Sequence, residues 1–235
     1  MVTLVVPFYN ETNRIERFKN GLLQYQNRNA LIKELIFIND GSTDETANLL
    51  NSLKINYHKI PISIITVAEN KGKGNAIKLG VATANQTWVL CNDADLSYTM
   101  EQLDEWYEQH KIDFTLQDTV YFGKRILNDK KSKFFLHRII IGKIFYYLIR
   151  LILGIKITDT QCGFKLYKTS IAKEVFKNLH EKKFAFDLEI IYKLQIKQYK
   201  IISLPVRCYD VQGSKVNLLS DSINMFLALF RIRKY

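Results

Sequence analysis

Short apolar runs alternate with helical patterns through the first hundred residues of the chain. Four runs are apolar almost throughout, which is typical of strands buried on both faces. They are Val2–Pro7, Leu35–Asn39, Ile62–Val67 and Trp88–Asn92. Between them, apolar residues recur at helical spacing over 15–22, 46–53 and 74–84. This series predicts an α/β fold with a mostly parallel central sheet and flanking helices.

The pattern becomes less regular after residue 97. It predicts, in order, a helix over 99–110, a strand near 119–123, a basic and apolar stretch over 134–157, a loop over 158–163, a helix over 187–196 and a strand over 201–206. No Gly/Ser-rich linker or internal repeat divides the sequence. We therefore expect one domain, in which residues 1–97 bind one ligand, residues 98–216 bind a second and residues 217–235 form a basic amphipathic helix.

Polar clusters follow three of the predicted strands. They are Tyr9-Asn10-Glu11, Asp40-Gly41-Ser42 and Asp93-Ala94-Asp95. Because ligands bind beyond the carboxyl ends of strands in open parallel sheets, we expect the three clusters to form one site. The segment from Ser42 to Glu45 also has the form of a capping box, which predicts that these two side chains bond the first amides of a helix.

Charge and cysteine usage narrow the classes of partner and location. The chain of 235 residues carries 34 Lys and Arg against 23 Asp and Glu, a net charge of +11 that favours an anionic partner. Its aromatic residues are not interleaved with bases, which argues against nucleic acid. Cys91, Cys162 and Cys208 show no CxxC spacing, so we expect neither a zinc site nor a disulfide framework, and a reducing, cytoplasmic location.

Two apolar segments bordered by bases are candidates for contact with a membrane. Four basic residues interrupt 134–157, so no uncharged run reaches the roughly 18 residues expected of a spanning helix. Residues 222–230 precede a basic end, which suits a helix lying among acidic headgroups. Core helices with basic ends are the alternative for both segments.

Asp93 and Asp95 place two carboxylates at a strand end. Carboxylates so spaced can converge on Mg²⁺ or Mn²⁺ together with a diphosphate, or they can be solvated residues of a turn. The segment Asn70-Lys71-Gly72-Lys73-Gly74 can bring amides and an ammonium to phosphate, or it can be a surface loop. Asp40 can accept hydrogen bonds from a base or ribose, or it can form its own turn.

Taken together, six motifs resemble family 2 glycosyltransferases of the GT-A fold in order and spacing. They are Pro7-Phe8-Tyr9-Asn10-Glu11, Asn39-Asp40-Gly41-Ser42-Thr43-Asp44, Asn70-Lys71-Gly72-Lys73-Gly74, Asp93-Ala94-Asp95, Gly123-Lys124-Arg125 and Asp159-Thr160-Gln161-Cys162-Gly163-Phe164-Lys165. The last motif, with Phe186-Asp187-Leu188-Glu189 and Gly213-Ser214-Lys215, is most similar to the dolichyl-phosphate β-glucosyltransferase branch and its bacterial polyprenyl-phosphate relatives. The resemblance covers nearly the whole chain.

The resemblance implies that the first half binds a nucleotide-sugar donor. By position it assigns the donor site to Pro7, Tyr9, Asn10, Glu11, Asp40, Lys73 and Asp93. It places Asp40 on the base and Lys73 beside the nucleotide. It makes Asp95 the principal ligand of Mg²⁺ or Mn²⁺, with Asp93 near the ribose and the metal.

The second half is expected to bind the acceptor. Arg125 and Arg138 are candidates for an acceptor phosphate, because a guanidinium can bind it through two hydrogen bonds, and Lys215 is a third candidate. A surface role is the alternative for Arg138 and Lys215. Asp187 has the position of the catalytic carboxylate of inverting members and can act as a base or orient the acceptor, unless it caps the following helix. Asp159 completes the catalytic set and is expected to order its loop.

We therefore predict an inverting, metal-dependent enzyme that moves glucose from UDP-glucose to a polyprenyl or dolichyl phosphate. It is expected to contact an acidic membrane peripherally, from the cytosolic side. One alternative keeps the fold and transfers the sugar of a UDP- or GDP-sugar to a saccharide, which makes Asp187 indispensable. Another is a non-enzymatic basic protein on the same scaffold, which metal-dependent binding of UDP would exclude.

Overall fold

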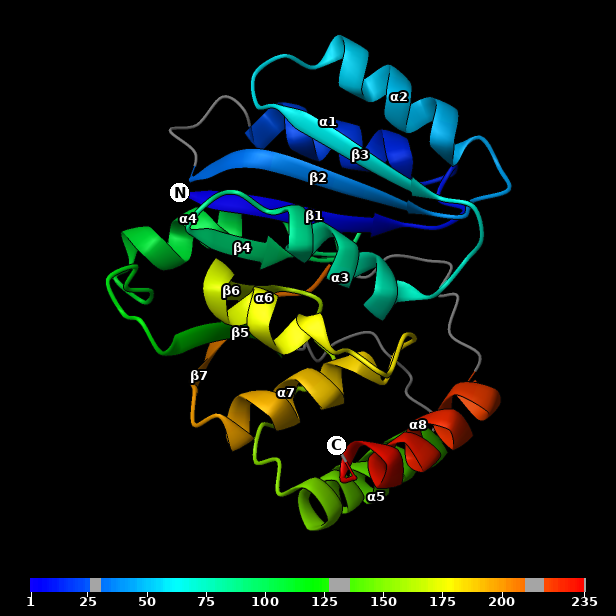
Figure 1. The fold of residues 1–235 in the computed structure, drawn as a ribbon, viewed down its shortest axis with the longest axis vertical. Helices are drawn as coiled ribbons and strands as arrows, with labels where there is room; N and C mark the ends of the chain where they lie inside the picture. The colour runs from blue at the N-terminus through cyan, green and yellow to red at the C-terminus, as the bar shows by residue number, and fades with distance from the viewer. Residues whose placement is uncertain (26–30, 127–135, 210–217, 235) are drawn as a thin grey trace.

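The computed structural model describes residues 1–25, 31–126, 136–209 and 218–234, without the side chains of 136–144 and 218–223. Its strands are β1 (Val2–Phe8), β2 (Ile32–Asp40), β3 (Ile62–Val67), β4 (Trp88–Cys91), β5 (Thr119–Ile126), β6 (Lys165–Lys168) and β7 (Lys200–Arg207). Its helices are α1 (Ile15–Tyr25), α2 (Thr46–Asn56), α3 (Lys73–Thr83), α4 (Glu101–Glu108), α5 (Leu136–Leu153), α6 (Thr169–Lys177), α7 (Phe186–Ile196) and α8 (Leu218–Ile232). Figure 1 shows the strands side by side, with helices around them.

The described strands form one sheet in the order β3-β2-β1-β4-β6-β5-β7. Neighbours among β3, β2, β1 and β4 are parallel. β6 runs antiparallel to both β4 and β5, whereas β5 and β7 are parallel to each other. The predicted α/β fold with a mostly parallel sheet is therefore confirmed, as are the four strands expected in the first half.

Two neighbouring elements, β6 and α6, were not predicted. β6 has only four residues and begins and ends with lysine, so it lacks the apolar run by which the other central strands were found. α6 follows it without a turn residue, although Ile171, Val175 and Phe176 have helical spacing and are buried. The sequence pattern did not predict β6 because the strand is short and contains a buried lysine. It did not predict α6 because no turn residue separates the helix from β6.

The capping box predicted at Ser42 is wrong. Helix α2 begins at Thr46, and the residue before it makes no side-chain capping bond. The Ser42 hydroxyl instead accepts a hydrogen bond from the Asn10 amide (3.0 Å), and the Asp44 carboxylate accepts from the amides of Thr46 (3.0 Å) and Thr12 (3.2 Å). Burial acts to raise the pKa of Asp44, but hydrogen bonds from the side chains and the amides of Thr46 and Thr12 lower it to about 2. The segment therefore joins two loops as well as starting a helix.

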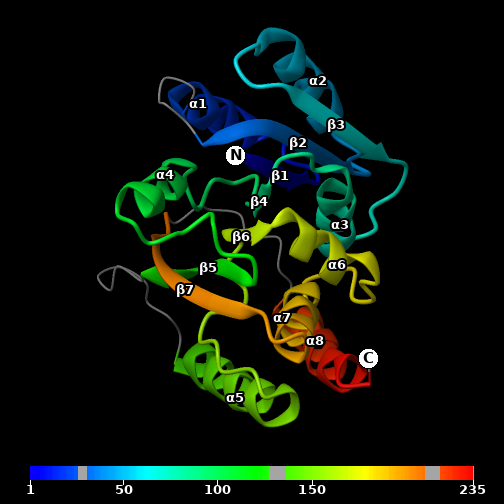
Figure 2. The same ribbon diagram turned by 60° about the vertical axis from the view of Figure 1, so that its left-hand side comes forward.

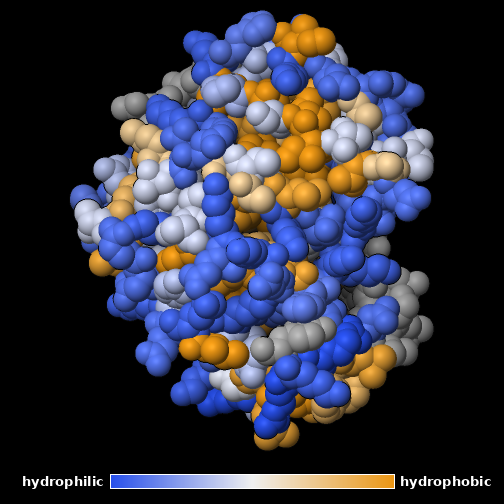
Figure 3. Space-filling model, in the orientation of Figure 1, coloured by the Kyte–Doolittle hydropathy of each residue, from blue (hydrophilic) through white to orange (hydrophobic). Residues whose placement is uncertain are grey.

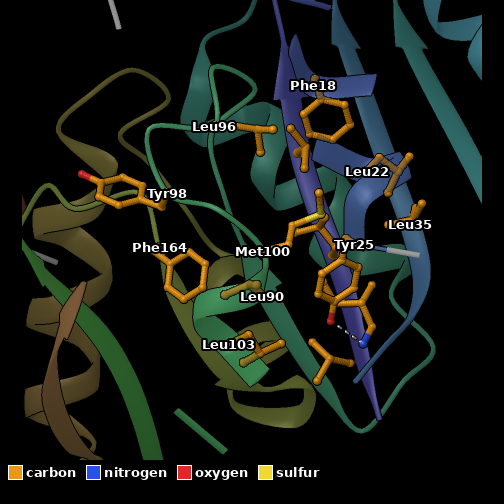
Figure 4. Packing of buried hydrophobic residues seen from close by; sticks show 14 of the residues in the cluster. Phe18, Leu22, Tyr25, Leu35, Leu90, Leu96, Tyr98, Met100, Leu103 and Phe164 are labelled. Atoms are coloured by element: carbon orange, nitrogen blue, oxygen red, sulfur yellow. Dashed lines mark hydrogen bonds between the residues drawn. The ribbon is translucent and has the colours of Figure 1, made fainter. Parts of the chain in front are cut away.

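Alternating side chains of the central strands pack into separate apolar layers on the two faces of the sheet. One layer holds residues of α1, α2 and α4, and the other holds residues of α3, α6, α7, α5 and α8 (Figure 2). Figure 4 shows Phe18, Leu22 and Tyr25 of α1 in the first layer, beside Met100 and Leu103. The buried Tyr25 hydroxyl accepts from the Ile32 amide (3.4 Å) and donates to Asp104 (3.2 Å). Helices thus cover both faces of the sheet, so a ligand can reach it only at the rim formed by the strand ends.

Helices α5 and α8 contact each other at one end of the molecule (Figure 1). Each buries one side, through Ile149 and Leu153 of α5 and through Leu229 and Ile232 of α8. None of the described helices is long and apolar enough to cross a bilayer.

Candidate active site

The loops after β1 and β2 are bonded to each other at the carboxyl-terminal rim of the sheet. The Thr43 amide donates to the Asn10 side-chain oxygen (2.8 Å), and the Glu11 amide donates to the Thr46 hydroxyl (2.7 Å). Asn10 has a φ of +52°, a conformation that Asn tolerates better than most residues. Upstream, Pro7 lies within β1, and Tyr9 is 39% exposed at the rim. The first two polar clusters therefore form one wall.

Asp40 fixes the loop that precedes α3. Its carboxylate is buried and accepts hydrogen bonds from the amides of Lys71 (3.0 Å) and Gly72 (2.8 Å), one on each oxygen. Gly41 has a φ of +67° and leaves no room for a side chain against the backbone of Glu69 and Asn70. Asp40 therefore holds the segment 70–74 in place, and its expected contact with a base stays a prediction.

Replacing Asp40 with Asn should loosen this loop. An amide has one acceptor oxygen, so one of the two backbone amides would face the new NH₂ group and stay unpaired. We expect the free energy of unfolding to fall by about 1–3 kcal/mol, the usual effect of an unsatisfied buried donor. Urea denaturation measures this, with Asp113→Asn as the exposed control, and an unchanged midpoint would contradict it.

The third cluster follows β4 and is held by Asn92. The buried Asn92 side chain donates to the Tyr98 carbonyl (2.9 Å) and accepts from the Asp93 amide (2.8 Å). The Asp95 carboxylate accepts from the Ser97 amide (2.8 Å). Because these bonds close the turn from within, Asp93 and Asp95 have defined positions at the strand end.

Lys73, the first residue of α3, reaches Asp93 from the neighbouring loop. Its ammonium lies 2.5 Å from Oδ1 of Asp93, and each side chain is about one quarter exposed. Burial acts to lower the pKa of Lys73, but the carboxylates of Asp93, Asp187 and Asp95 raise it above its ordinary value. The lysine is therefore a fixed cation in a cluster of acids.

The turn at Gly163 brings the second half of the chain to the same place. A Cβ on Gly163 would overlap the Asp93 carboxylate, so any larger residue there would push that carboxylate out of its place. The motif 159–165 is thus placed against the Asp93 to Asp95 turn by direct contact. A small pocket at this junction is lined by Lys73, Gly163, Lys165 and Asp187 together with apolar side chains.

The donor set suits a hard divalent cation. Asp93 and Asp95 offer carboxylate oxygens, and the ammonium held at Asp93 shows that this position attracts a cation. Within the described part of the chain, no group of three or more acidic, His or Cys side chains is placed to hold a metal alone. Two carboxylates that share the ion with phosphate oxygens match the usual way in which Mg²⁺ is bound.

Asp187 is paired and does not cap its helix. It lies in the first turn of α7, for which Ala185 is the capping position, so the N-cap alternative is wrong. Its Oδ1 forms a buried ion pair with the ammonium of Lys165, a residue to which sequence reasoning gave no role. Burial raises the pKa of Asp187 above its usual range, against the opposing effect of Lys165 and Lys73. A carboxylate that takes up a proton more readily is better suited to act as a base.

Arg125 and Asp159 form a bidentate pair at the end of β5. The guanidinium donates through Nε (2.8 Å) and Nη2 (2.9 Å), and the Arg125 amide adds a third bond (3.0 Å). Burial acts to raise the pKa of Asp159, but Arg125 lowers it overall. Asp159 thus orders this loop, and the Arg125 side chain stays 40% exposed. The side chain of Arg138 and all of Lys215 lie outside the described residues.

Glu189, the last residue of the motif around Asp187, has a structural position. It is fully buried, accepts hydrogen bonds from the amides of His180 (3.0 Å) and Glu181 (2.7 Å), and pairs with Lys193 (2.6 Å). The loop that it holds lies against α3, where the Asn75 amide donates to the Lys182 carbonyl (3.2 Å). Glu189 therefore holds the loop that joins α6 to α7.

Comparison with known proteins agrees with this geometry. Residues 3–176 match the family described as glycosyl transferase family 2. The chain is 30% identical to dolichyl-phosphate β-glucosyltransferase of Dictyostelium discoideum over 99% of this chain and 73% of that protein. It is 30% identical to the human dolichyl-phosphate β-glucosyltransferase over 92% of this chain and 69% of that protein. The chain therefore belongs to glycosyl transferase family 2 and is a glycosyltransferase, similar within that family to these dolichyl-phosphate enzymes.

Solved structures show the same fold at low sequence identity. Glucosyl-3-phosphoglycerate synthase of Mycobacterium tuberculosis in complex with UDP superposes with a TM-score of 0.71 at 15% identity, over 100% of this chain and 80% of that chain. The complex of that enzyme with Mn²⁺, UDP-glucose and phosphoglyceric acid gives a TM-score of 0.71 at 14% identity and the same coverage. The predicted GT-A fold is thereby confirmed.

Proposed function

We propose that this protein transfers glucose from UDP-glucose to a polyprenyl or dolichyl phosphate, with inversion at the anomeric carbon. One observation carries the proposal: Lys73 and Asp187, from the two halves of the chain, line one pocket, and Lys73 is paired there with Asp93 of the Asp93 to Asp95 turn. The names of the relatives from Dictyostelium and human support the sugar and the acceptor. The UDP-glucose and Mn²⁺ in the structural neighbour support the donor and the metal.

The chemistry needs a donor half and an acceptor half. An acceptor phosphate oxygen attacks the anomeric carbon, the bond from that carbon to the β-phosphate oxygen breaks, and its electron pair leaves with UDP. A divalent cation held by Asp95 and Asp93 would supply positive charge for the diphosphate. Lys73 adds a second positive charge beside it, and the wall formed by Asn10, Glu11 and the loop held by Asp40 borders the donor.

Arg125 is the described residue that we assign to the acceptor phosphate. Hydrogen bonds to Asp159 already orient the Arg125 guanidinium. The side chain is therefore in place before the acceptor binds and loses little conformational freedom on binding. We assign Arg138 and Lys215 to the same phosphate. A lipid phosphate is already anionic near neutral pH, so cations that bring two anions together are more important for its reaction than proton removal.

We also propose that α5 and α8 contact an acidic membrane. Both helices expose large apolar side chains, which are Tyr147, Leu151, Phe226, Leu227 and Phe230. Exposed bases, Arg150 on α5 and Arg233 after α8, lie close to them in sequence. Figure 3 shows hydrophobic and hydrophilic residues together at this lower end of the molecule. Apolar side chains among bases fit a headgroup layer of acidic lipids.

The double variant Leu151→Asp/Phe230→Asp should bind vesicles more weakly. Burial of one large apolar side chain contributes about 1.5–3 kcal/mol, so we expect a loss of at least about 100-fold in partitioning for the pair. Sedimentation with phosphatidylglycerol vesicles measures it. Ile55→Asp, at an apolar residue of α2 that is 69% exposed, is the control and should bind as the wild type does. Equal binding of all three proteins would contradict the membrane proposal.

Radiolabelled transfer tests the proposed function. The protein is incubated with labelled UDP-glucose, Mn²⁺ or Mg²⁺ and dolichyl or polyprenyl phosphate in detergent. We expect label in the organic phase only when the metal and the lipid phosphate are both present. Label that stays in the aqueous phase with every such lipid would refute the lipid acceptor.

A saccharide acceptor is the second candidate. It is favoured by the position of Asp187 in the pocket and by its raised pKa, which suit removal of a proton from a hydroxyl group. Labelled oligosaccharide formed in place of labelled lipid would identify this function.

A further inference from the structure

Lys165 is a buried cation in the middle of the sheet. Its strand, β6, lies between β4 and β5, with Lys165 opposite Cys91 on one side and Phe122 on the other. The side chain is 3% exposed, and its ammonium lies 5.3 Å from the centre of the Phe122 ring. A lone ammonium in such a place is strongly unfavourable, so its partners determine what it does there.

The hydrogen-bond and ion-pair partners of Lys165 hold its ammonium in the wall of the pocket. The ammonium donates to the Thr160 carbonyl (3.0 Å) and pairs with Oδ1 of Asp187, whose side chain is 8% exposed. Within the described part of the chain, no group donates to the other oxygen of that carboxylate, Oδ2. Lys165 therefore fixes one oxygen of Asp187 and leaves the other to a ligand.

A buried ion pair alone does not show a function, because apolar residues of similar size often stabilise a core equally well. Three further features place this pair in the site. Both residues line the pocket shared with Lys73. Lys165 lies two residues after Gly163, which contacts Asp93. Lys165, Asp187, Lys73 and Asp93 also form a series of alternating charges from the sheet to the rim.

We propose that Lys165 is a positioning residue for the transfer reaction: it holds the Asp187 carboxylate with Oδ2 directed toward the acceptor. This inference rests on the proposed function and extends it to a residue of the 159–165 motif. The motif then has three functions in the site, because Asp159 orients Arg125, Gly163 makes room for Asp93 and Lys165 orients Asp187.

The variant Lys165→Met tests the proposal, because it removes the charge and keeps most of the side-chain volume. We expect kcat to fall by about 10- to 100-fold, the range typical when a group that orients a site residue is removed. The KM for UDP-glucose and the binding of UDP with Mn²⁺ should change little. Lys193→Met is the matched control, because Lys193 also pairs with a carboxylate of α7, Glu189, but does not line the pocket. It should keep the wild-type kcat even if it lowers the melting temperature.

The smaller variant Lys165→Ala separates positioning from general stability. Removal of the side chain leaves a space that ethylammonium can fill, so added ethylammonium should restore part of kcat in a saturable way. Tetramethylammonium has the same charge but is too large to enter, and it should restore nothing. Wild-type kcat in Lys165→Met would overturn the inference, and so would the absence of rescue in Lys165→Ala.

A crystal structure of Lys165→Met tests the same inference without the reaction. We expect the Asp187 side chain to turn away from its wild-type position, and an unchanged position would overturn the inference. If the wild-type protein transfers no glucose to lipid phosphate, the proposed function fails, and this structure still decides whether Lys165 orients Asp187.

Discussion

Replacing Asp95 with Asn is expected to lower the turnover number by about 100- to 1,000-fold, because the diphosphate then loses several kcal/mol of stabilisation from a bound cation. Asn is nearly the same size, and its side-chain oxygen can still accept the hydrogen bond from the Ser97 amide. The turn after β4 should therefore keep its shape, and the melting temperature should change little. Steady-state transfer of labelled glucose measures the effect.

A control and a binding measurement make the Asp95 result specific. Asp118→Asn alters an exposed aspartate before β5 and should leave turnover unchanged. Calorimetry should show that Mn²⁺ strengthens the binding of UDP to the wild type but much less to Asp95→Asn. If Asp95→Asn keeps both full turnover and the response to Mn²⁺, Asp95 is not a ligand of the metal.

Replacing Asp187 with Asn should have the second large effect on activity. Loss of a positioned base or orienting carboxylate lowers rates by about 100- to 10,000-fold. With a lipid phosphate, which attacks as an anion, we expect a loss of rate of about 100-fold. With a saccharide, whose hydroxyl group must lose a proton, we expect loss of all detectable activity. Rates for both acceptor classes, measured on one preparation, therefore test the role of Asp187 and the identity of the acceptor.

Stability complicates Asp187→Asn, because Lys165 would keep a buried charge without its counter-ion. Removal of one partner of a buried pair can destabilise a fold by about 3–5 kcal/mol. The double variant Asp187→Asn/Lys165→Met removes both charges, so it should recover much of the stability while remaining as inactive as the single variant. Recovery of activity in the double variant would show that Asp187 acts only through stability.

Most of the first half of the fold could be predicted because β1, β4 and the second half of β2 are buried on both faces and are therefore almost entirely apolar. Val2–Phe8 and residues 35–38 of β2 are examples, and the polar residues that follow them mark the rim. β6 could not be found in this way, since a four-residue strand bounded by lysines has no such pattern. Only the fold shows that Lys165 is buried and paired.

The sequence indicates which residues are candidates for the site, but it does not indicate which of them touch one another. The positions of Asp93 and Asp95 follow from a motif at a strand end, and that of Lys73 follows from a glycine-rich loop before a helix. Both patterns can be read from the local sequence. The contact of Gly163 with Asp93 and the pairing of Asp187 with Lys165 join residues that are far apart in the sequence. Spacing within a motif contains no information on such contacts, so the sequence alone cannot separate an N-cap role for Asp187 from a role in the site.

A crystal structure with UDP and Mn²⁺ tests the proposed donor and metal site most directly. We predict manganese beside the Asp95 and Asp93 carboxylates, with the two phosphate groups of UDP bound to the same ion and uridine against the wall formed by the loops after β1 and β2. UDP bound elsewhere, or Asp93 and Asp95 with no ion beside them at saturating Mn²⁺, would refute this assignment of the donor and metal site.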